Sequence, residues 1–408
     1  MNKSIKAMVL AIIASFPAIS ALAADAEEKI PVIIVFQKET PFHQLTSYAA
    51  TADARAKQHP EGWSYLDKGV LGAVKRLEGV HHFSSTHVFS HAVKGFAVSL
   101  TQAQITALKS EPTIASIEVD APIKVNAQEL PWGISKVGAD KSSTQAGNGS
   151  GAITNVNAYV IDTGIAREAD LNVVKFVNFI DSNNTDCNGH GTHVAGTIGA
   201  IDNGIEVVGV APGIKLTAVK VLDCNGSGTT SSVIKGIDWV TANAVRPAVA
   251  NMSLGGGASS ALDNAVLQSA NSNIFYALAA GNSGADACNS SPARIGFNQN
   301  GVANGIIATA AIGSDSTETS WSNYGKCVDV WAPGLYIDST NYKGGTPVTM
   351  SGTSMASPHT AGAAALYLSR HSTATASQVE QAILTYSVNA GTRSKDGNAV
   401  KLLQVNSF

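Results

Sequence analysis

The sequence predicts an α/β fold with a mostly parallel sheet that is covered by helices on both faces, preceded by a small α+β domain. Two observations predict this. After residue 150, near-continuous apolar runs alternate with helical stretches, which is the pattern of parallel strands buried on both faces. Before residue 127, shorter strands with alternating apolar residues accompany a helix, which indicates a separate unit.

The larger domain is expected to span residues 127–408. Its strand runs are Ala158–Ile161, Leu216–Leu222, Ala248–Leu254, Ile274–Ala280, Ile306–Ile312 and Val328–Trp331. Its helical stretches are His193–Ile201, Ser231–Val245, Ala261–Asn271, Ser357–Ser369 and Ala376–Tyr386. Ligands of an open parallel sheet bind beyond the carboxyl ends of its strands, so residues that follow these runs are the first candidates for a site.

The smaller domain is expected within residues 24–126. Strands are predicted over Pro31–Gln37, Lys94–Leu100 and Ile114–Val119. The sequence Thr101-Gln102-Ala103-Gln104 is a capping box, so it predicts the start of a helix that runs to Lys109. An ordinary α+β binding domain is the alternative for this segment.

Residues 1–23 have the pattern of a secretory signal peptide. Lys3 and Lys6 precede an apolar stretch from Met8 to Ile19, and small residues then predict cleavage after Ala23. The apolar stretch is too short for a mature membrane helix, although an uncleaved anchor is the alternative. We therefore expect a secreted protein, in the medium or in the periplasm, without a membrane segment after cleavage.

The net charge and the cysteines bear on possible partners and on disulfide formation. The formal net charge of −3 over 408 residues gives no case for nucleic-acid binding. Four cysteines in an exported chain suggest two disulfides. Three pairings are formally possible among Cys187, Cys224, Cys288 and Cys327.

Three short motifs together suggest a nucleophilic triad. Ser354 lies in Gly352-Thr-Ser-Met-Ala-Ser-Pro-His359, where a glycine-rich loop meets a helical run and the hydroxyl lies near a positive helix end. By itself this serine would be read as a helix cap. Asp162, however, ends a strand run, and His190 lies within the motif Asn188–Gly196, so the residues occur in the order Asp162, His190, Ser354.

Other chemistries fit these motifs less well. Asp162-Thr-Gly is also the aspartic-protease signature, but no second copy supplies the required partner carboxylate. His190 and His193 lack the intervening glutamate of a zinc protease, so His193 is expected to be structural. The nucleophile comes last in the chain, whereas it comes first in an α/β-hydrolase.

The triad order and all three local motifs resemble the subtilisin-like serine proteases, nearest their proteinase K-like branch. The resemblance implies that Ser354 attacks the peptide carbonyl, His190 accepts its proton and Asp162 orients the histidine. The segment Ala279–Gly284 matches the oxyanion loop of the family, which implies that the Asn282 amide stabilises the oxyanion together with the Ser354 N–H. The alternative for Asn282 is a turn residue in the left-handed conformation.

The resemblance also implies how substrate binds. A peptide would add as a strand between two glycine-containing edges and enter a small uncharged pocket, which favours apolar or aromatic P1 residues and broad specificity. Segments matching these features contain Ser253, Leu254, Gly255, Gly226, Ser227, Ala279, Ala280 and Gly281. A flexible loop is the alternative for the glycines after Leu254.

Residues 24–126 resemble the inhibitor-type propeptide of this family. The resemblance implies a monomeric endopeptidase that cuts its own chain near Ala127, is inhibited by its own propeptide, and then acts on proteins and peptides. It also implies the disulfides Cys187–Cys224 and Cys288–Cys327.

A structural Ca²⁺ is the expected cofactor. Asp329 matches a calcium-binding aspartate of the branch, with carbonyl partners expected beside the polar stretch 295–304, which is longer than in relatives. A solvated carboxylate at a strand edge is the alternative.

Two other functions stay open from the sequence. An exported binding or inhibitor protein could be built on a dead protease scaffold, although the intact set of Asp162, His190, Ser354 and Asn282 speaks against it. A lipase or esterase would turn over esters without hydrolysing casein.

Overall fold

The computed structural model describes residues 29–52, 66–120, 128–296 and 302–408. The chain divides into two compact units, residues 1–124 and 125–408. The predicted signal peptide and the cleavage points after Ala23 and near Ala127 lie outside the described residues. In the part of the chain that is described, no helix is long and apolar enough to cross a membrane.

The smaller unit is a four-stranded antiparallel sheet with helices packed on it. Its strands are β1 (Ile30–Phe36), β2 (Ser85–Phe89), β3 (Gly95–Leu100) and β4 (Ile114–Val119), in the order β2-β3-β1-β4. Its helices are α2 (Lys68–His81) and α3 (Gln102–Leu108), with short 3₁₀ turns at 42–44 and 46–52. The capping box at Thr101 is confirmed. Helix α2 and strand β2 were not predicted from the sequence.

The larger unit is built on a nine-stranded sheet in the order β16-β17-β13-β12-β10-β8-β5-β7-β6. All neighbours pair in parallel except β16 and β17, which form an antiparallel edge. The strands are β5 (Asn157–Asp162), β6 (Val173–Asn178), β7 (Lys215–Lys220), β8 (Ala248–Met252), β10 (Phe275–Ala279), β12 (Ile306–Ile312), β13 (Val330–Pro333), β16 (Val388–Arg393) and β17 (Ala399–Leu402). The predicted mostly parallel fold is therefore confirmed.

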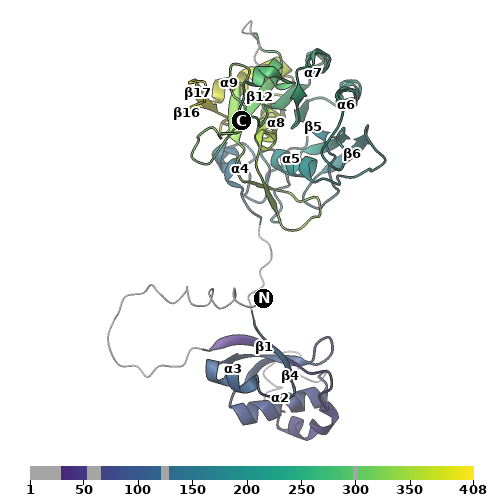
Figure 1. Cartoon of the computed structure of the whole chain (residues 1–408), viewed down its shortest axis with the longest axis vertical. Helices are drawn as coiled ribbons and strands as arrows, with labels where there is room; N and C mark the ends of the chain where they lie inside the picture. Colours follow the sequence, from purple (N-terminus) through teal and green to yellow (C-terminus); the bar gives the residue numbers. More distant parts are fainter. Residues whose placement is uncertain (1–28, 53–65, 121–127, 297–301) are drawn as a thin grey trace, which may run out of the picture. The chain divides into compact units, whose positions relative to one another are not determined.

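Helices cover both faces of this sheet and enclose two apolar cores. On one face lie α5 (His190–Gly199), α8 (Thr353–Arg370) and α9 (Ala376–Tyr386), whose buried residues share one cluster. On the other lie α6 (Thr230–Asn243) and α7 (Ser260–Asn271), which pack side by side (Figure 1). The short helix α4 (Trp132–Lys136) precedes β5.

Two helices begin earlier than the sequence analysis expected. The helix α5 begins at His190 instead of His193, and α8 begins at Thr353 instead of Ser357. Both histidine and serine therefore lie in the first turn of a helix. The strands that the sequence analysis missed, β6 and the β16–β17 hairpin, are partly exposed, so they lack a continuous apolar run.

Two disulfides and two short hairpin-like pairs tie the loops of the larger unit. The structure pairs Cys187 with Cys224 and Cys288 with Cys327, as the resemblance implied, across 37 and 39 residues. In the chain-entropy model, loops of this length give about 4 kcal/mol each. The short pairs are β9 (Gly256–Gly257) with β11 (Ser290–Ser291) and β14 (Ile337–Ser339) with β15 (Val348–Met350).

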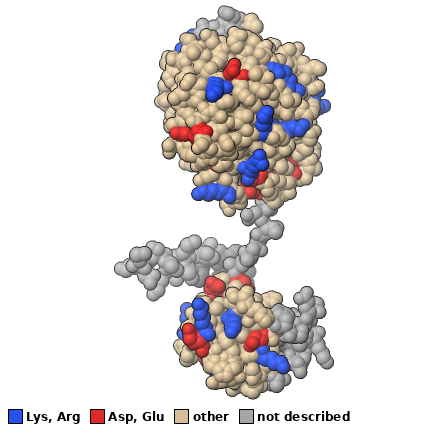
Figure 2. Space-filling view, turned by 90° about the vertical axis from the view of Figure 1, so that its right-hand side faces the viewer, with Lys and Arg blue, Asp and Glu red and all other residues tan. Residues whose placement is uncertain are grey.

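Charged side chains are sparse on the surface of the larger unit. Figure 2 shows separate lysines and arginines with fewer acidic residues on the face that it presents. Many of the unit's carboxylates are instead buried, namely Asp162, Asp170, Asp186, Asp202, Asp263, Glu318, Asp329 and Glu380. Buried carboxylates need hydrogen bonds or cations, so they mark the places where chemistry and structure meet.

Candidate active site

Asp162 and His190 form a close pair at the carboxyl end of the sheet. Asp162 is the last residue of β5 and is fully buried, and its Oδ1 lies 2.7 Å from His190 Nδ1. The same oxygen accepts the Thr163 N–H at 2.7 Å. A buried carboxylate on Nδ1 leaves the other ring nitrogen, Nε2, as the one that can take up a proton.

The histidine is held at a helix start that requires a glycine before it. Gly189 has φ +103°, and a Cβ there would lie 2.7 Å from the Tyr342 ring. The His190 side chain stays 26% exposed. Burial disfavours its charged form, but the charge and hydrogen bond of Asp162 and the charge of Asp186 outweigh burial and raise the pKa of His190 above its usual value.

Asp186 is a second carboxylate that organises this helix start, and the sequence analysis missed it. It is 2% exposed, and its Oδ1 accepts from the Asn188 and Gly189 N–H groups and from Thr163 Oγ1 at 2.9–3.0 Å. Its Oδ2 accepts the Thr192 N–H at 2.9 Å and the Thr192 hydroxyl at 2.6 Å. Asp186 thus joins the end of β5 to the first turn of α5.

Ser354 is the second residue of α8 and faces the end of β8. Its hydroxyl donates to the Ser253 carbonyl at 3.1 Å, and the Ser253 hydroxyl donates to the Ser354 carbonyl at 2.7 Å. Ser354 is not the helix cap, because that position belongs to Gly352. Within the described residues no hydrogen bond joins Ser354 to His190, and such bonds often tighten only when substrate binds.

Asn282 follows β10 and presents a free amide donor. Its Oδ1 accepts both the Thr353 N–H and the Thr353 hydroxyl at 2.9 Å. This leaves Nδ2, which makes no hydrogen bond within the described chain, on the side of the serine loop. The left-handed alternative for Asn282 is wrong, because positive φ angles occur at Gly281 and Gly284 and not at Asn282.

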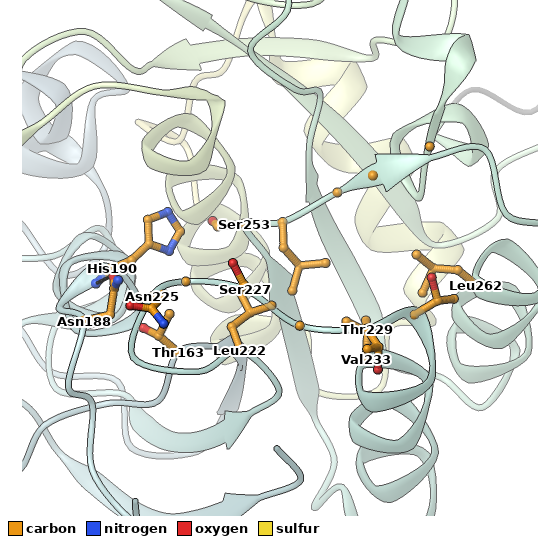
Figure 3. A pocket seen from close by; sticks show the side chains of 17 residues that line it. Thr163, Asn188, His190, Leu222, Asn225, Ser227, Thr229, Val233, Ser253 and Leu262 are labelled. Carbon is orange, nitrogen blue, oxygen red and sulfur yellow. Dashed lines mark hydrogen bonds between the residues drawn. The ribbon is translucent and has the colours of Figure 1, made fainter. Parts of the chain in front are cut away.

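A groove of about 540 Å³ runs from His190 between two backbone edges. One edge contains Asn225, Gly226 and Ser227, and the other contains Ser253, Leu254 and Gly255. Figure 3 shows His190 at one end of the groove, with Val233 and Leu262 at the other. Apolar side chains therefore contribute to the far end of the groove.

A second cavity of about 370 Å³ opens beside Ser354. Ala279, Ala280, Gly281 and Asn282 line one side of it. Its lining contains no charged side chain, and the two segments Leu254–Gly257 and Ser290–Ser291 complete its walls. The structure thus places every predicted substrate-binding residue on one of the two adjoining hollows.

His193 is structural, as predicted. It is fully buried, and its Nε2 lies 2.9 Å from the Ile337 carbonyl and 3.0 Å from the Val348 carbonyl. Burial lowers its pKa to about 4, so it is neutral at working pH. It joins α5 to the β14–β15 pair and makes no contact that would serve a metal.

A calcium site at Asp329 would need ligands from a segment that the structure describes only in part. The carboxylate is 8% exposed and one oxygen accepts the Ala308 N–H at 2.7 Å. The expected carbonyl partners fall beside residues 297–301, which lie outside the described part. Among described residues there is no cluster of three or more His, Cys, Asp or Glu suited to a metal. Asp329 therefore stays a prediction.

Buried carboxyl oxygens without hydrogen-bond partners in the described chain occur elsewhere, at Glu168, Asp170 and Glu206, which were not predicted from the sequence. Nearby, Gln128 Nε2 donates to the Ile201 carbonyl at 2.7 Å and to the Val207 carbonyl at 3.1 Å. Asp170 is fully buried beside them, its Oδ1 has no partner, and burial raises its pKa to about 7. Carboxylate oxygens are among the ligands that Ca²⁺ prefers.

Comparisons with known proteins agree with this geometry. Residues 154–403 match the model of the subtilase family, and residues 31–126 match that of the peptidase inhibitor I9 family. The chain is 41% identical over 380 residues to the extracellular serine proteinase of Thermus sp. (strain Rt41A), covering 90% of this chain and 87% of that protein. It is 36% identical over 403 residues to the thermostable alkaline protease of Halalkalibacterium halodurans, covering 98% of each.

Two further similarities complete the comparison. The chain is 43% identical to the alkaline serine exoprotease A of Vibrio alginolyticus over 81% of its own length, but spans only 62% of that protein. A solved structure of a cold-adapted subtilisin-like serine proteinase matches with a TM-score of 0.58 and 40% identity, covering 67% of this chain and 97% of that one. The chain belongs to the subtilase family of serine proteases and carries an I9 propeptide domain before its catalytic domain.

Proposed function

We propose that the protein is a secreted serine endopeptidase that hydrolyses peptide bonds with Asp162, His190 and Ser354 and releases its own propeptide. The observation that carries the proposal is the 2.7 Å contact between Asp162 and His190 at the same sheet edge as the first turn of α8. Such a pair is what a serine needs to become a nucleophile.

The chemistry follows from this placement. The Ser354 hydroxyl breaks its hydrogen bond to the Ser253 carbonyl and turns to His190. Its oxygen then attacks the substrate carbonyl while its proton passes to His190 Nε2. The Asn282 amide and the Ser354 N–H stabilise the oxyanion that forms. His190 then protonates the leaving amine, and an acyl-enzyme remains. A water molecule then attacks the acyl-enzyme and gives its proton to His190. This step releases the carboxylic acid product and regenerates Ser354.

The two hollows favour apolar peptide residues. The uncharged cavity beside Ser354 would take the P1 side chain, since no carboxylate is there to hold lysine or arginine. Leu222, Val233, Leu254 and Leu262 line the groove farther along, so a second apolar side chain would bind there. Main-chain hydrogen bonds to the two edges would add little sequence preference, which gives broad specificity.

The I9 domain supports a self-processing precursor. The domain has its own core, so it could fold as an intramolecular inhibitor until the junction near Ala127 is cut. The Thermus relative is named extracellular, which agrees with a signal over residues 1–23 and with export. We propose a monomer that acts on protein and peptide substrates.

Calcium would stabilise this enzyme without joining the reaction. Asp170 Oδ1 would hold the ion together with the buried oxygens of Glu168 and Glu206, all of which lack a hydrogen-bond partner within the described residues. Repulsion among the carboxylates at this place supports the proposal. Burial, together with the charges of Glu206 and Asp170, raises the pKa of Glu168 to about 8. A bound cation would remove that repulsion.

Expression of Ser354→Ala tests the proposal. The variant should accumulate as a precursor of the full length after signal removal, while the wild type matures. A serine-directed fluorophosphonate should label mature wild type on Ser354, and casein should be hydrolysed. Maturation of Ser354→Ala without added protease, or labelling elsewhere, would contradict the proposal. An esterase would cleave esters and leave casein intact.

A further inference from the structure

Asn251 is a buried polar residue in the middle of the parallel sheet, where apolar residues are the rule. It lies on β8 opposite Val160 of β5 and Ala277 of β10, and it is 1% exposed. A buried amide that served packing alone would cost free energy unless fully hydrogen-bonded. Its partners therefore show what it does.

Both ends of the Asn251 amide bind serines next to the nucleophile. Its Nδ2 donates to Ser253 Oγ at 2.9 Å, and its Oδ1 accepts from Ser357 Oγ at 2.7 Å. Ser253 leads into the substrate-binding edge, and Ser357 lies one turn beyond Ser354 on α8. One amide thus joins the edge to the nucleophile helix.

The direction of these hydrogen bonds determines where the Ser253 proton points. A hydroxyl has one proton, and because Asn251 already donates to Ser253 Oγ, that proton is free to bind the Ser354 carbonyl at 2.7 Å. If the amide were reversed, Ser253 would face two acceptors with one proton, and one buried oxygen would lack a donor. The observed orientation gives each of the three hydroxyl and amide oxygens in the network a donor or an acceptor.

We propose that Asn251 is a positioning residue that holds the Ser354 main chain, and with it the oxyanion N–H and the hydroxyl, in register with the substrate edge. It acts through Ser253 and touches no reacting atom. The inference rests on the proposed role of Ser354 as nucleophile. Shifts of about 1 Å in such geometry cost on the order of 10²-fold in rate, so the effect should appear in kcat.

Asn251→Asp is the sharpest test because it keeps the shape and removes the donor. At a pH above the pKa of the introduced carboxyl, the ionised carboxylate would take the Ser253 proton and leave the Ser354 carbonyl without a partner. We expect kcat to fall by about 10–100-fold while KM stays within about threefold, since the substrate edge remains. The second-order rate constant for fluorophosphonate labelling of Ser354 should fall in parallel.

The pH dependence separates positioning from simple damage. In the Asn251→Asp variant, the introduced carboxyl could donate again once it is protonated, and burial raises the pKa of such a carboxyl. The ratio of kcat between Asn251→Asp and wild type should therefore rise as the pH falls. Asn251→Leu has no titratable group, so its loss of kcat should be independent of pH.

Ser269→Ala is the matched control for loss of buried polar contacts. Ser269 is fully buried on the opposite face of the sheet and binds the Thr241 and Tyr276 hydroxyls at 2.7 Å. It should lower the melting temperature and leave kcat unchanged. If Asn251→Asp does not fold, Ser357→Ala is the alternative test, because it removes the hydrogen bond to Asn251 Oδ1 and keeps the one to Ser253. It should lower kcat by about 3–10-fold, since the Ser354 main chain would be held less firmly.

The outcomes are distinguishable. Wild type that is not labelled on Ser354 would contradict the proposed function itself. Wild type that labels normally, with Asn251→Asp and Asn251→Leu that melt earlier yet keep kcat within threefold, would overturn the positioning role alone.

Discussion

Replacement of Asn282 distinguishes an electrostatic from a structural role for this residue. Asn282→Asp keeps the shape and keeps Oδ1, which accepts from the Thr353 N–H and hydroxyl at 2.9 Å. It exchanges only the free Nδ2 for an oxygen. Asn282→Ala removes both functions. The two variants therefore separate the donor from the acceptor that holds the loop.

The size of the effect follows from the one donor that is free. A hydrogen bond to a charged group contributes about 1.5–3 kcal/mol, which is a factor of roughly 10–150 in rate. Loss of an oxyanion donor in a subtilisin costs about 10²–10³, a value taken over from that enzyme. Asn282→Ala should thus lose about 10²-fold in kcat. Asn282→Asp should lose more, because like charges about 3 Å apart repel by several kcal/mol at an effective dielectric constant of about 20.

The assay is steady-state hydrolysis of a peptide anilide with enzyme counted by active-site titration. The expected order of kcat is wild type, then Asn282→Ala, then Asn282→Asp, with KM within about twofold throughout. Thr353→Val is the control, because it removes one of the two donors to Oδ1 and should cost only a few-fold. If Asn282→Asp retains more activity than Asn282→Ala, then Asn282 serves as a loop anchor and the oxyanion argument fails.

Three further predictions concern specificity, pH and calcium. Ser290→Asp places a carboxylate on the wall of the P1 cavity and should raise kcat/KM for substrates with P1 lysine by roughly tenfold or more. Ser290→Asn, which adds no charge, should not raise it. If the two variants change kcat/KM for P1 lysine equally, the assignment of this cavity to P1 is refuted. Because His190 must be neutral to accept a proton and its pKa is raised, kcat/KM should fall on the acid side from a pH above that of an ordinary histidine. Asp186→Asn should move this limb to lower pH, while Asp238→Asn on the exposed side of α6 should leave it in place. If calcium is near 100 times its Kd, a chelator should lower the melting temperature of Ser354→Ala by roughly 5–10 °C. Asp170→Asn should remove this response. If Asp329→Asn removes it instead, the calcium ion binds at Asp329.

The triad and the sheet were predictable because they depend on local patterns. Apolar runs such as Ile306–Ile312 mark buried parallel strands, and the order of Asp162, His190 and Ser354 is specific to one arrangement. Asp162 and His190 are adjacent in space because β5 ends where α5 begins, and the family resemblance carried that information. The fold and the candidate residues could therefore be read from sequence alone.

The residues that support the triad could not be predicted in the same way. Asp186 sits in a polar loop where its sequence neighbours suggest an ordinary turn, and its role appears only when Thr163 and Thr192 are brought to it. Asn251 interrupts an apolar run and was counted as part of a strand. Asp170 and Glu206 lie far apart in the sequence and interact only in the folded chain. Tertiary contacts, which leave no periodic signal, define these roles.

Each reactive group in this site is held by a polar partner from a distant part of the chain, and this has a consequence for how the site responds to change. Asn282 is held by Thr353, and Ser354 is held by Ser253, so both oxyanion donors depend on the first turn of α8. A small movement of that turn would disturb the nucleophile together with both donors, because Thr353 and Ser354 are consecutive residues of α8. Variants that loosen the turn should therefore lower kcat, and double variants within it should be less than additive, because both changes disturb the same geometry.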